Sequence, residues 1–72
     1  MAIKGGVGQV TGLFSNAVDG DWIQVSGVTN WIKCQATNGA MMTVAADARR
    51  AGTAVVVIYD DASWALFEIK ST

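Results

Sequence analysis

Apolar and polar positions alternate in two stretches that follow Gly20. Residues 22–26 alternate, residues 27–30 read Gly-Val-Thr-Asn and form a turn, and residues 31–36 alternate again. A period of two places successive side chains on opposite faces of a β-strand. The two stretches therefore predict an antiparallel hairpin.

A second turn signal follows this hairpin. Residues 37–39 read Thr-Asn-Gly, and both Asn and Gly tolerate the positive φ angles that tight hairpin turns require. A three-residue loop with the glycine in the left-handed conformation would set Cys34 beside Met42. We therefore expect a third strand over residues 41–45. Residues 46–52 break the alternation and predict either a loop or a single helical turn.

The C-terminal third predicts a second hairpin. Residues 54–59 and 64–70 are rich in β-branched and aromatic side chains, which favour strands, and residues 60–63 read Asp-Asp-Ala-Ser. A four-residue loop at this point would set Tyr59 opposite Trp64.

The N-terminal segment has a different character. It carries few large side chains, and it contains five glycines, namely Gly5, Gly6, Gly8, Gly12 and Gly20. We interpret residues 1–20 as an extended arm that pairs as a short edge strand or lies across a neighbouring subunit. Residues 21–72 would then form a single β domain. The predicted fold is all-β, a small antiparallel meander that closes into a barrel or a two-layer sandwich.

Length and composition suggest a need for partners. The chain has 72 residues, of which 51% are apolar and 15% charged, and a single domain of this size has a marginal core. Cys34 is the only cysteine and histidine is absent, so neither an intrachain disulfide nor a zinc site is expected. Oligomerisation remains as a source of stability. We therefore expect a homo-oligomer, for example a trimer.

Charge and hydropathy argue against two other classes of partner. The five Lys and Arg residues are spread along the chain and the net charge is −1, so a phosphate-binding patch is not expected. The longest strongly apolar run, residues 54–59, is far shorter than the roughly 20 residues of a membrane helix. We expect no nucleic acid and no membrane partner. A single free cysteine fits assembly in a reducing cytoplasm.

The candidate catalytic and binding motifs are explained more simply by structural roles. Asp19, Asp21 and the Asp60-Asp61 pair are best explained as turn residues, because a calcium-loop pattern is missing. Cys34 has no histidine to activate it. The glycine-rich residues 5–12 lack the spacing of a phosphate loop, and we take them as flexible backbone. No catalytic residue, cofactor or metal is expected.

The tryptophans carry the functional signal. Trp22, Trp31 and Trp64 fall in phase with polar residues of their strands, which predicts an aromatic outer face. Such residues anchor protein interfaces, and sugar stacking is the second reading. A third reading has strand-end tryptophans capping the core of a monomer. The predicted interface residues are Trp22, Trp31, Tyr59, Trp64, Leu66, Val7, Val10, Leu13 and Phe14.

A glycine-rich arm, residues 1–12, followed by a compact apolar β domain resembles the small accessory proteins of tailed bacteriophage virions, such as capsid cement or decoration proteins. The resemblance implies a non-enzymatic virion protein, assembled in the host cytoplasm, that oligomerises and reinforces capsid or tail contacts by binding a larger structural protein. The alternative function is a carbohydrate-binding or tail-fibre receptor-binding module. A third is a small β-barrel that binds a peptide by strand addition.

Overall fold

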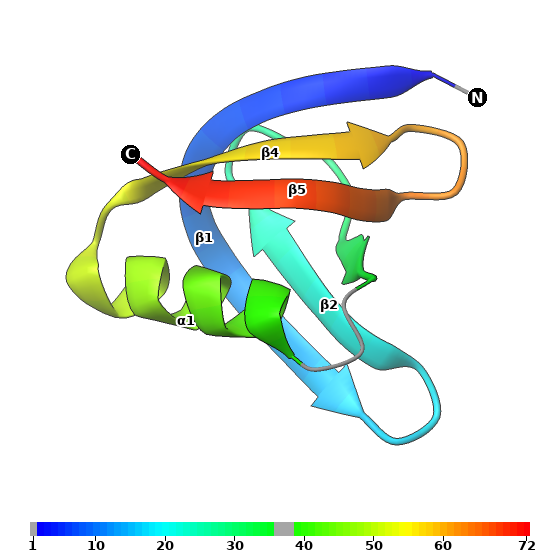
Figure 1. Cartoon of the computed structure of the whole chain (residues 1–72), viewed down its shortest axis with the longest axis horizontal. Coiled ribbons are helices and arrows are strands. Elements are labelled where there is room, and N and C mark those ends of the chain that lie inside the picture. Colours follow the sequence, from blue (N-terminus) through cyan, green and yellow to red (C-terminus); the bar gives the residue numbers. More distant parts are fainter. Residues whose placement is uncertain (1, 36–38) are drawn as a thin grey trace.

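The computed structural model describes residues 2–35 and 39–72 and is mostly β, as predicted (Figure 1). Within these ranges the chain forms five strands and one helix. They are β1 (Ile3–Asn16), β2 (Gly20–Val25), β3 (Ile32–Cys34), α1 (Ala40–Ala51), β4 (Ala54–Asp60) and β5 (Ala65–Ser71). The strands close into one ring in the order β1-β2-β3-β5-β4.

The ring is a mixed sheet, so the predicted antiparallel meander is wrong. β3 and β5 run parallel, with Lys33 opposite Ala65 and Cys34 opposite Leu66, whereas the other four pairs are antiparallel. The cause is α1, which lies between β3 and β4 in the chain. Because the chain crosses through this helix, β4 pairs with β1 instead of its predecessor β3, and β3 meets β5.

The glycine-rich segment is extended, as expected, but it is β1, a strand built into the ring. Its first half pairs with β4, from Ile3 opposite Asp60 to Gln9 opposite Ala54. Its second half pairs with β2, and the register shifts near Val10. Each half of β1 therefore pairs with a different neighbouring strand, and Figure 1 shows that β1 is strongly curved.

The glycines of β1 permit close packing. A Cβ on Gly8 would lie 2.5 Å from Ser26 Oγ and 2.7 Å from the backbone nitrogen of Gly27, and one on Gly6 would lie 2.9 Å from a methyl of Val28. Real Cβ atoms essentially never make contacts this short. The interpretation as flexible backbone is therefore wrong at these positions, because glycine here lets the β2–β3 connection lie directly on β1.

The third predicted strand, residues 41–45, is instead the first half of α1. Ala, Met and Arg are strong helix formers, and they outweigh the local strand pattern. Gly39 and Gly52 flank the helix, both in the left-handed conformation, with φ of 75° and 72°. The left-handed Gly39 was predicted, but it leads into a helix. The rest of the predicted Thr-Asn-Gly turn lies outside the described residues.

α1 packs against the ring through its small side chains. Ala45 and Ala48, three positions apart, are buried, and Met41 and Met42 pack at the edge of the same contact. The predicted strand contact between Cys34 and Met42 is thus replaced by packing of α1 on the ring. Figure 1 shows the helix crossing beside β1.

The two predicted hairpins are present. β2 pairs with β3, with Ile23 opposite Ile32, and β4 pairs with β5. The predicted register of the second hairpin is wrong. Val57 lies opposite Ile69, and after an irregularity between Ile58 and Tyr59, Tyr59 lies opposite Leu66 instead of Trp64.

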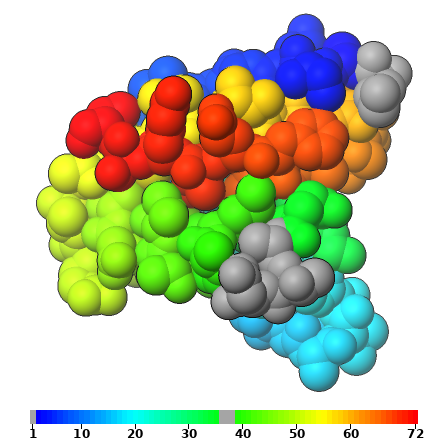
Figure 2. Space-filling view, viewed as in Figure 1, coloured from blue at the N-terminus to red at the C-terminus, as the bar shows by residue number. Residues whose placement is uncertain are grey.

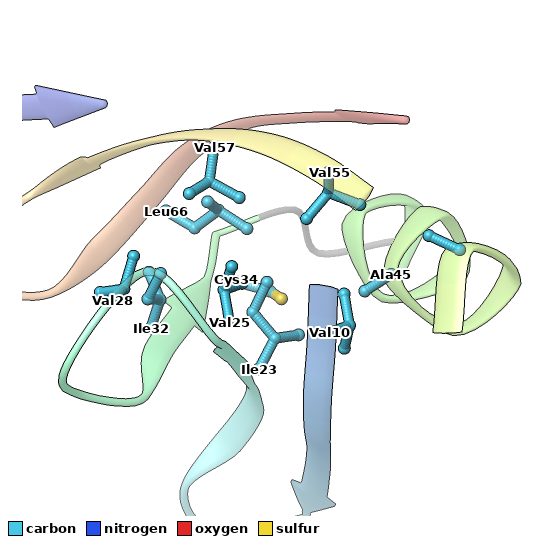
Figure 3. Close-up of a cluster of buried hydrophobic side chains, with 11 residues drawn as sticks. Val10, Ile23, Val25, Val28, Ile32, Cys34, Ala45, Val55, Val57 and Leu66 are labelled. Carbon is cyan, nitrogen blue, oxygen red and sulfur yellow. The ribbon is translucent and has the colours of Figure 1, made fainter. Parts of the chain in front are cut away.

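The core fills the space inside the ring (Figure 3). Side chains from β4 and β5 point toward those of β2 and β3, and Ala45 contributes from α1. The buried apolar residues are Val10, Ile23, Val25, Val28, Ile32, Cys34, Ala45, Ala48, Val55, Val57 and Leu66. The folded chain exposes 4156 Å². Area scaling gives about 4,200 Å² for a compact monomer of this mass, so the folded chain is as compact as expected for its size.

Candidate functional site

An open apolar groove lies on the outer face of the ring, beside the β1–β2 turn. It has a volume of about 410 Å³ and is lined by Phe14, Asp19, Trp22 and Trp31. In the view of Figure 2, the end of the β1–β2 hairpin projects beyond the rest of the molecule. The groove brings together three aromatic side chains, Phe14, Trp22 and Trp31, from separate segments of the chain.

Strand phase turns two of these rings outward. Phe14 of β1 lies directly opposite Trp22 of β2, and their neighbours Leu13 and Ile23 form the next pair. Ile23 is fully buried, so the Phe14–Trp22 pair belongs to the opposite, solvent side of the sheet. Phe14 is 43% exposed. The predicted outward orientation of Trp22 is confirmed.

Trp31 forms the third wall and rests on Gly12. A Cβ at position 12 would lie 2.7 Å from Trp31 Cη2, so only glycine leaves room for the indole there. The Trp31 and Phe14 rings meet edge to face, with centroids 6.3 Å apart and planes at 67°. Trp31 is 39% exposed, which agrees with its predicted phase.

Hydrogen bonds fix the remaining wall. Trp22 Nε1 donates to the carbonyl oxygen of Asp19 at 2.9 Å. The Asn16 side-chain oxygen accepts from the amides of Val18 and Asp19, and Asn16 Nδ2 donates to the Asp19 carboxylate at 3.1 Å. Lys33 Nζ lies 5.9 Å from the centroid of the Trp22 ring. The turn and the indole are thus held in one arrangement.

Tyr59 and Trp64 do not join this groove. Their rings stack on each other, with centroids 5.6 Å apart and planes at 15°, and both are partly buried against the core. Trp64 has a φ of 60°, and its carbonyl accepts the Lys33 amide at 2.8 Å. Trp64 therefore links the start of β5 to β3 through this hydrogen bond.

Four further predicted interface residues divide into two groups. Leu66 is fully buried and Val10 is 5% exposed, so both belong to the core and neither can contact a partner. The prediction that Leu66 lies on an outer apolar face is wrong, because this face of β4 and β5 is the core side, where Val57 is also fully buried. Val7 and Leu13 are exposed on β1 but do not line the groove.

The titratable groups with perturbed pKa values have structural roles. Burial, and secondarily the Asp21 charge, raises the pKa of the Cys34 thiol to about 11, which keeps it protonated and unreactive. The Ala62 amide donates to the Asp60 carboxylate and lowers its pKa, and the Ser63 hydroxyl adds a second bond. Asp60 thus organises the β4–β5 turn, as predicted for a turn residue.

The part of the chain that the structure describes shows neither a metal-binding cluster nor a membrane-spanning helix. Residues 2–35 and 39–72 contain no group of three or more Cys, Asp or Glu side chains placed to hold a metal ion. In the same part of the chain, no helix has the length and apolar character needed to cross a membrane.

Sequence reasoning missed Gly12 and Asp19 as parts of the site. The turn signal at Asp19-Gly20 was visible, but nothing in the pattern indicated that this turn borders a groove. For Gly12 the signal lies across the sheet, since its importance depends on Trp31, which is nineteen positions away in the chain.

Comparison with models of protein families, with curated proteins and with solved structures gives no significant match for this chain. Functional inference therefore depends on the geometry of the groove.

Proposed function

We propose that the chain is a non-enzymatic protein-binding module whose aromatic groove anchors a side chain of a partner protein. The observation that carries this proposal is the cluster of exposed Phe14 and Trp31 with half-buried Trp22 around a preformed apolar groove. Aromatic rings are enriched among the residues that dominate interface energy, and a rigid site loses little entropy on binding. The groove stands on strands and hydrogen-bonded turns, so it needs no rearrangement.

We further infer that the ring is a small barrel of the OB type. The strand order, the parallel β3–β5 contact and the helix between β3 and β4 support this inference. Barrels of this type bind ligands on the face of their second and third strands and the adjoining loops, which is where the groove lies. The analogy supports the location of the site but does not identify its ligand.

Charge favours protein over nucleic acid as the ligand. Asp19 lines the groove, Asp21 follows it, and Lys33 is the basic residue beside Trp22. These three side chains together carry one negative charge, whereas tracking a phosphate backbone requires several cations.

The setting we propose is a phage virion, in which the module reinforces capsid or tail contacts as a cement or decoration protein. A small rigid ring with an exposed aromatic groove suits such mechanical work, since repetition over a symmetric particle multiplies modest contacts. The partners would be a larger structural protein, such as a capsid protein, and further copies of the chain, for example in a trimer. Light scattering over a range of concentrations tests the self-association.

The test of function is incorporation into particles. Particles of the encoding phage would be purified with the wild type, with a Phe14→Ser/Trp31→Ser variant, or with Phe67→Ser as the matched control. Phe67 is 49% exposed and lies on β5, away from the groove. We expect the wild type and the control to be incorporated, and the groove variant to be lost while its circular dichroism stays native. Equal incorporation of all three, or particles that lack the chain, would refute the proposal.

A glycan is the second candidate. The observation in its favour is that polar residues lie near Trp22. Asp19 lies on the groove wall, and Gln24 is the next residue on the same face of β2. Titration with neutral saccharides, followed by tryptophan fluorescence, distinguishes the two functions. Saturable quenching that is lost in the Trp31→Ser variant would favour the glycan.

A further inference from the structure

We propose that the groove selects a cationic side chain of its partner, and arginine above all. This inference rests on the proposed function, because it names the chemistry that the same groove recognises. Its basis is the combination of aromatic walls with an acidic residue, Asp19, around a single groove.

The aromatic walls favour a cation. The face of an aromatic ring carries partial negative charge, and tryptophan gives the strongest attraction. Two of the three rings that line the groove are indoles, Trp22 and Trp31. The edge-to-face arrangement of Trp31 with Phe14 makes a corner, in which a group inserted into the groove meets more than one ring.

The molecule already shows this attraction internally. Lys33 Nζ lies 5.9 Å from the centroid of Trp22, within the range of a cation–π contact. Trp22 is held in place by its hydrogen bond to the Asp19 carbonyl, so the ring does not need to turn to receive a cation. The partner's charge would meet the same kind of surface in the groove.

Asp19 adds a negative charge beside the aromatic walls. Asn16 Nδ2 donates to its Oδ2 at 3.1 Å and so orients the carboxylate. A carboxylate has about four acceptor positions, so capacity remains for a donor from the partner. A cation held between the rings would also be attracted by this carboxylate, whereas an apolar side chain would gain nothing from it.

Arginine matches these walls better than lysine. Its planar guanidinium stacks on aromatic faces while its donors reach a carboxylate, and it is more weakly hydrated than an ammonium group. A groove of about 410 Å³ with apolar walls also accommodates the methylene stem. The occupant is thus an exposed arginine of the partner protein.

A pair of isosteric probes tests the inference. N-acetyl-L-arginine methylamide and its uncharged citrulline counterpart would be titrated into the 72-residue protein, with the three indole N–H signals followed by NMR. We expect the arginine probe to shift the Trp22 and Trp31 signals and the citrulline probe to bind about 3- to 30-fold more weakly, from the cation–π and ion-pair contributions.

Two variants locate the charge that matters. Asp19→Asn keeps the backbone carbonyl that accepts the Trp22 hydrogen bond. It should lower the affinity for the arginine probe about two- to fivefold. Glu68→Gln removes an exposed carboxylate from β5 and serves as the matched control, with no expected change. The Trp22 indole signal in the free variants checks that the groove is intact.

The outcomes separate this inference from the proposed function. Equal binding of the two probes, or no binding of either, overturns the selection of a cation while groove-dependent particle incorporation still stands. Loss of discrimination in the Glu68→Gln control would overturn the assignment to Asp19. Failure of the Phe14→Ser/Trp31→Ser variant to alter incorporation would instead remove the proposed function itself.

Discussion

Replacing Gly8 with alanine tests whether β1 is a packed strand or a loose arm. The new Cβ would lie 2.5 Å from Ser26 Oγ and 2.7 Å from the Gly27 nitrogen. The second atom belongs to the backbone, so it cannot turn aside. The Ser26 hydroxyl also accepts the Gln9 amide at 3.0 Å, and this bond would be displaced.

The expected magnitude follows from three contributions. Overpacking costs about 1–3 kcal/mol, and loss of the Gln9–Ser26 bond costs about 0.5–1.5 kcal/mol. The lower entropy of the unfolded alanine chain offsets about 0.4–1 kcal/mol. We therefore expect Gly8→Ala to be destabilised by about 0.5–4 kcal/mol, or roughly 2–30 °C in Tm for a domain of this size.

Gly5→Ala is the matched control on the same strand. A Cβ there would lie 3.8 Å from a methyl of Ile58 and 3.9 Å from the carbonyl oxygen of Val57, which are ordinary contacts. Only the lower entropy of the unfolded chain should remain as an effect, so the free energy of unfolding of this variant should rise by about 0.4–1 kcal/mol. Urea and thermal unfolding followed by circular dichroism measure both variants. If Gly8→Ala proves as stable as Gly5→Ala, β1 does not pack as described.

Three further predictions follow from buried groups. Cys34 should resist thiol reagents at pH 8 until urea unfolds the chain. Its pKa is about 11 in the folded chain against an ordinary 9.0. The free energy of unfolding should therefore fall as the pH rises from 9 to 11, which unfolding measured at several pH values would show. The Ala62 amide lowers the pKa of Asp60 below its ordinary 3.8. The ionised carboxylate should therefore stabilise the fold above pH 3.8, and this stabilisation should be lost as the pH falls through the folded pKa. Acid unfolding of Asp60→Asn should lack this pH-dependent loss of stability. Leu66→Ala should cost about 2–5 kcal/mol in urea unfolding, since the side chain is fully buried, whereas Phe14→Ala should cost less than about 1.5 kcal/mol; equal costs would contradict their placement.

Local pattern was sufficient for the two hairpins. Alternation placed Ile23 and Ile32 inside and turned Trp22 and Trp31 outward, and the structure agrees. Side-chain parity within one strand is set by the chain itself, so it can be read without knowledge of the fold.

The helix and the parallel contact were not visible in the same way. Residues 41–45 match a strand as well as a helix over so short a window, and the choice depends on Ala45 and Ala48 packing on the ring. The β3–β5 contact joins Cys34 to Leu66, which are far apart in sequence. Its existence depends on the path that the helix imposes.

The glycines of β1 show a further limit of sequence reasoning. A glycine that provides flexibility and one that permits close contact look the same in sequence. What distinguishes Gly8 and Gly12 is the identity of the atoms above them, Ser26 and Gly27 in one case and Trp31 in the other. Those neighbours become known only once the ring is closed.

The most direct test of the groove as the working surface is hydroxyl-radical footprinting, read by mass spectrometry, on the free protein and on the protein in purified particles. Trp31 is 39% exposed and Phe14 43% in the free chain, so both should be oxidised there. We predict that oxidation of both falls strongly on assembly while that of Phe67 on β5 persists. Oxidation of Trp31 and Phe14 that stays unchanged in particles containing the chain would contradict the account.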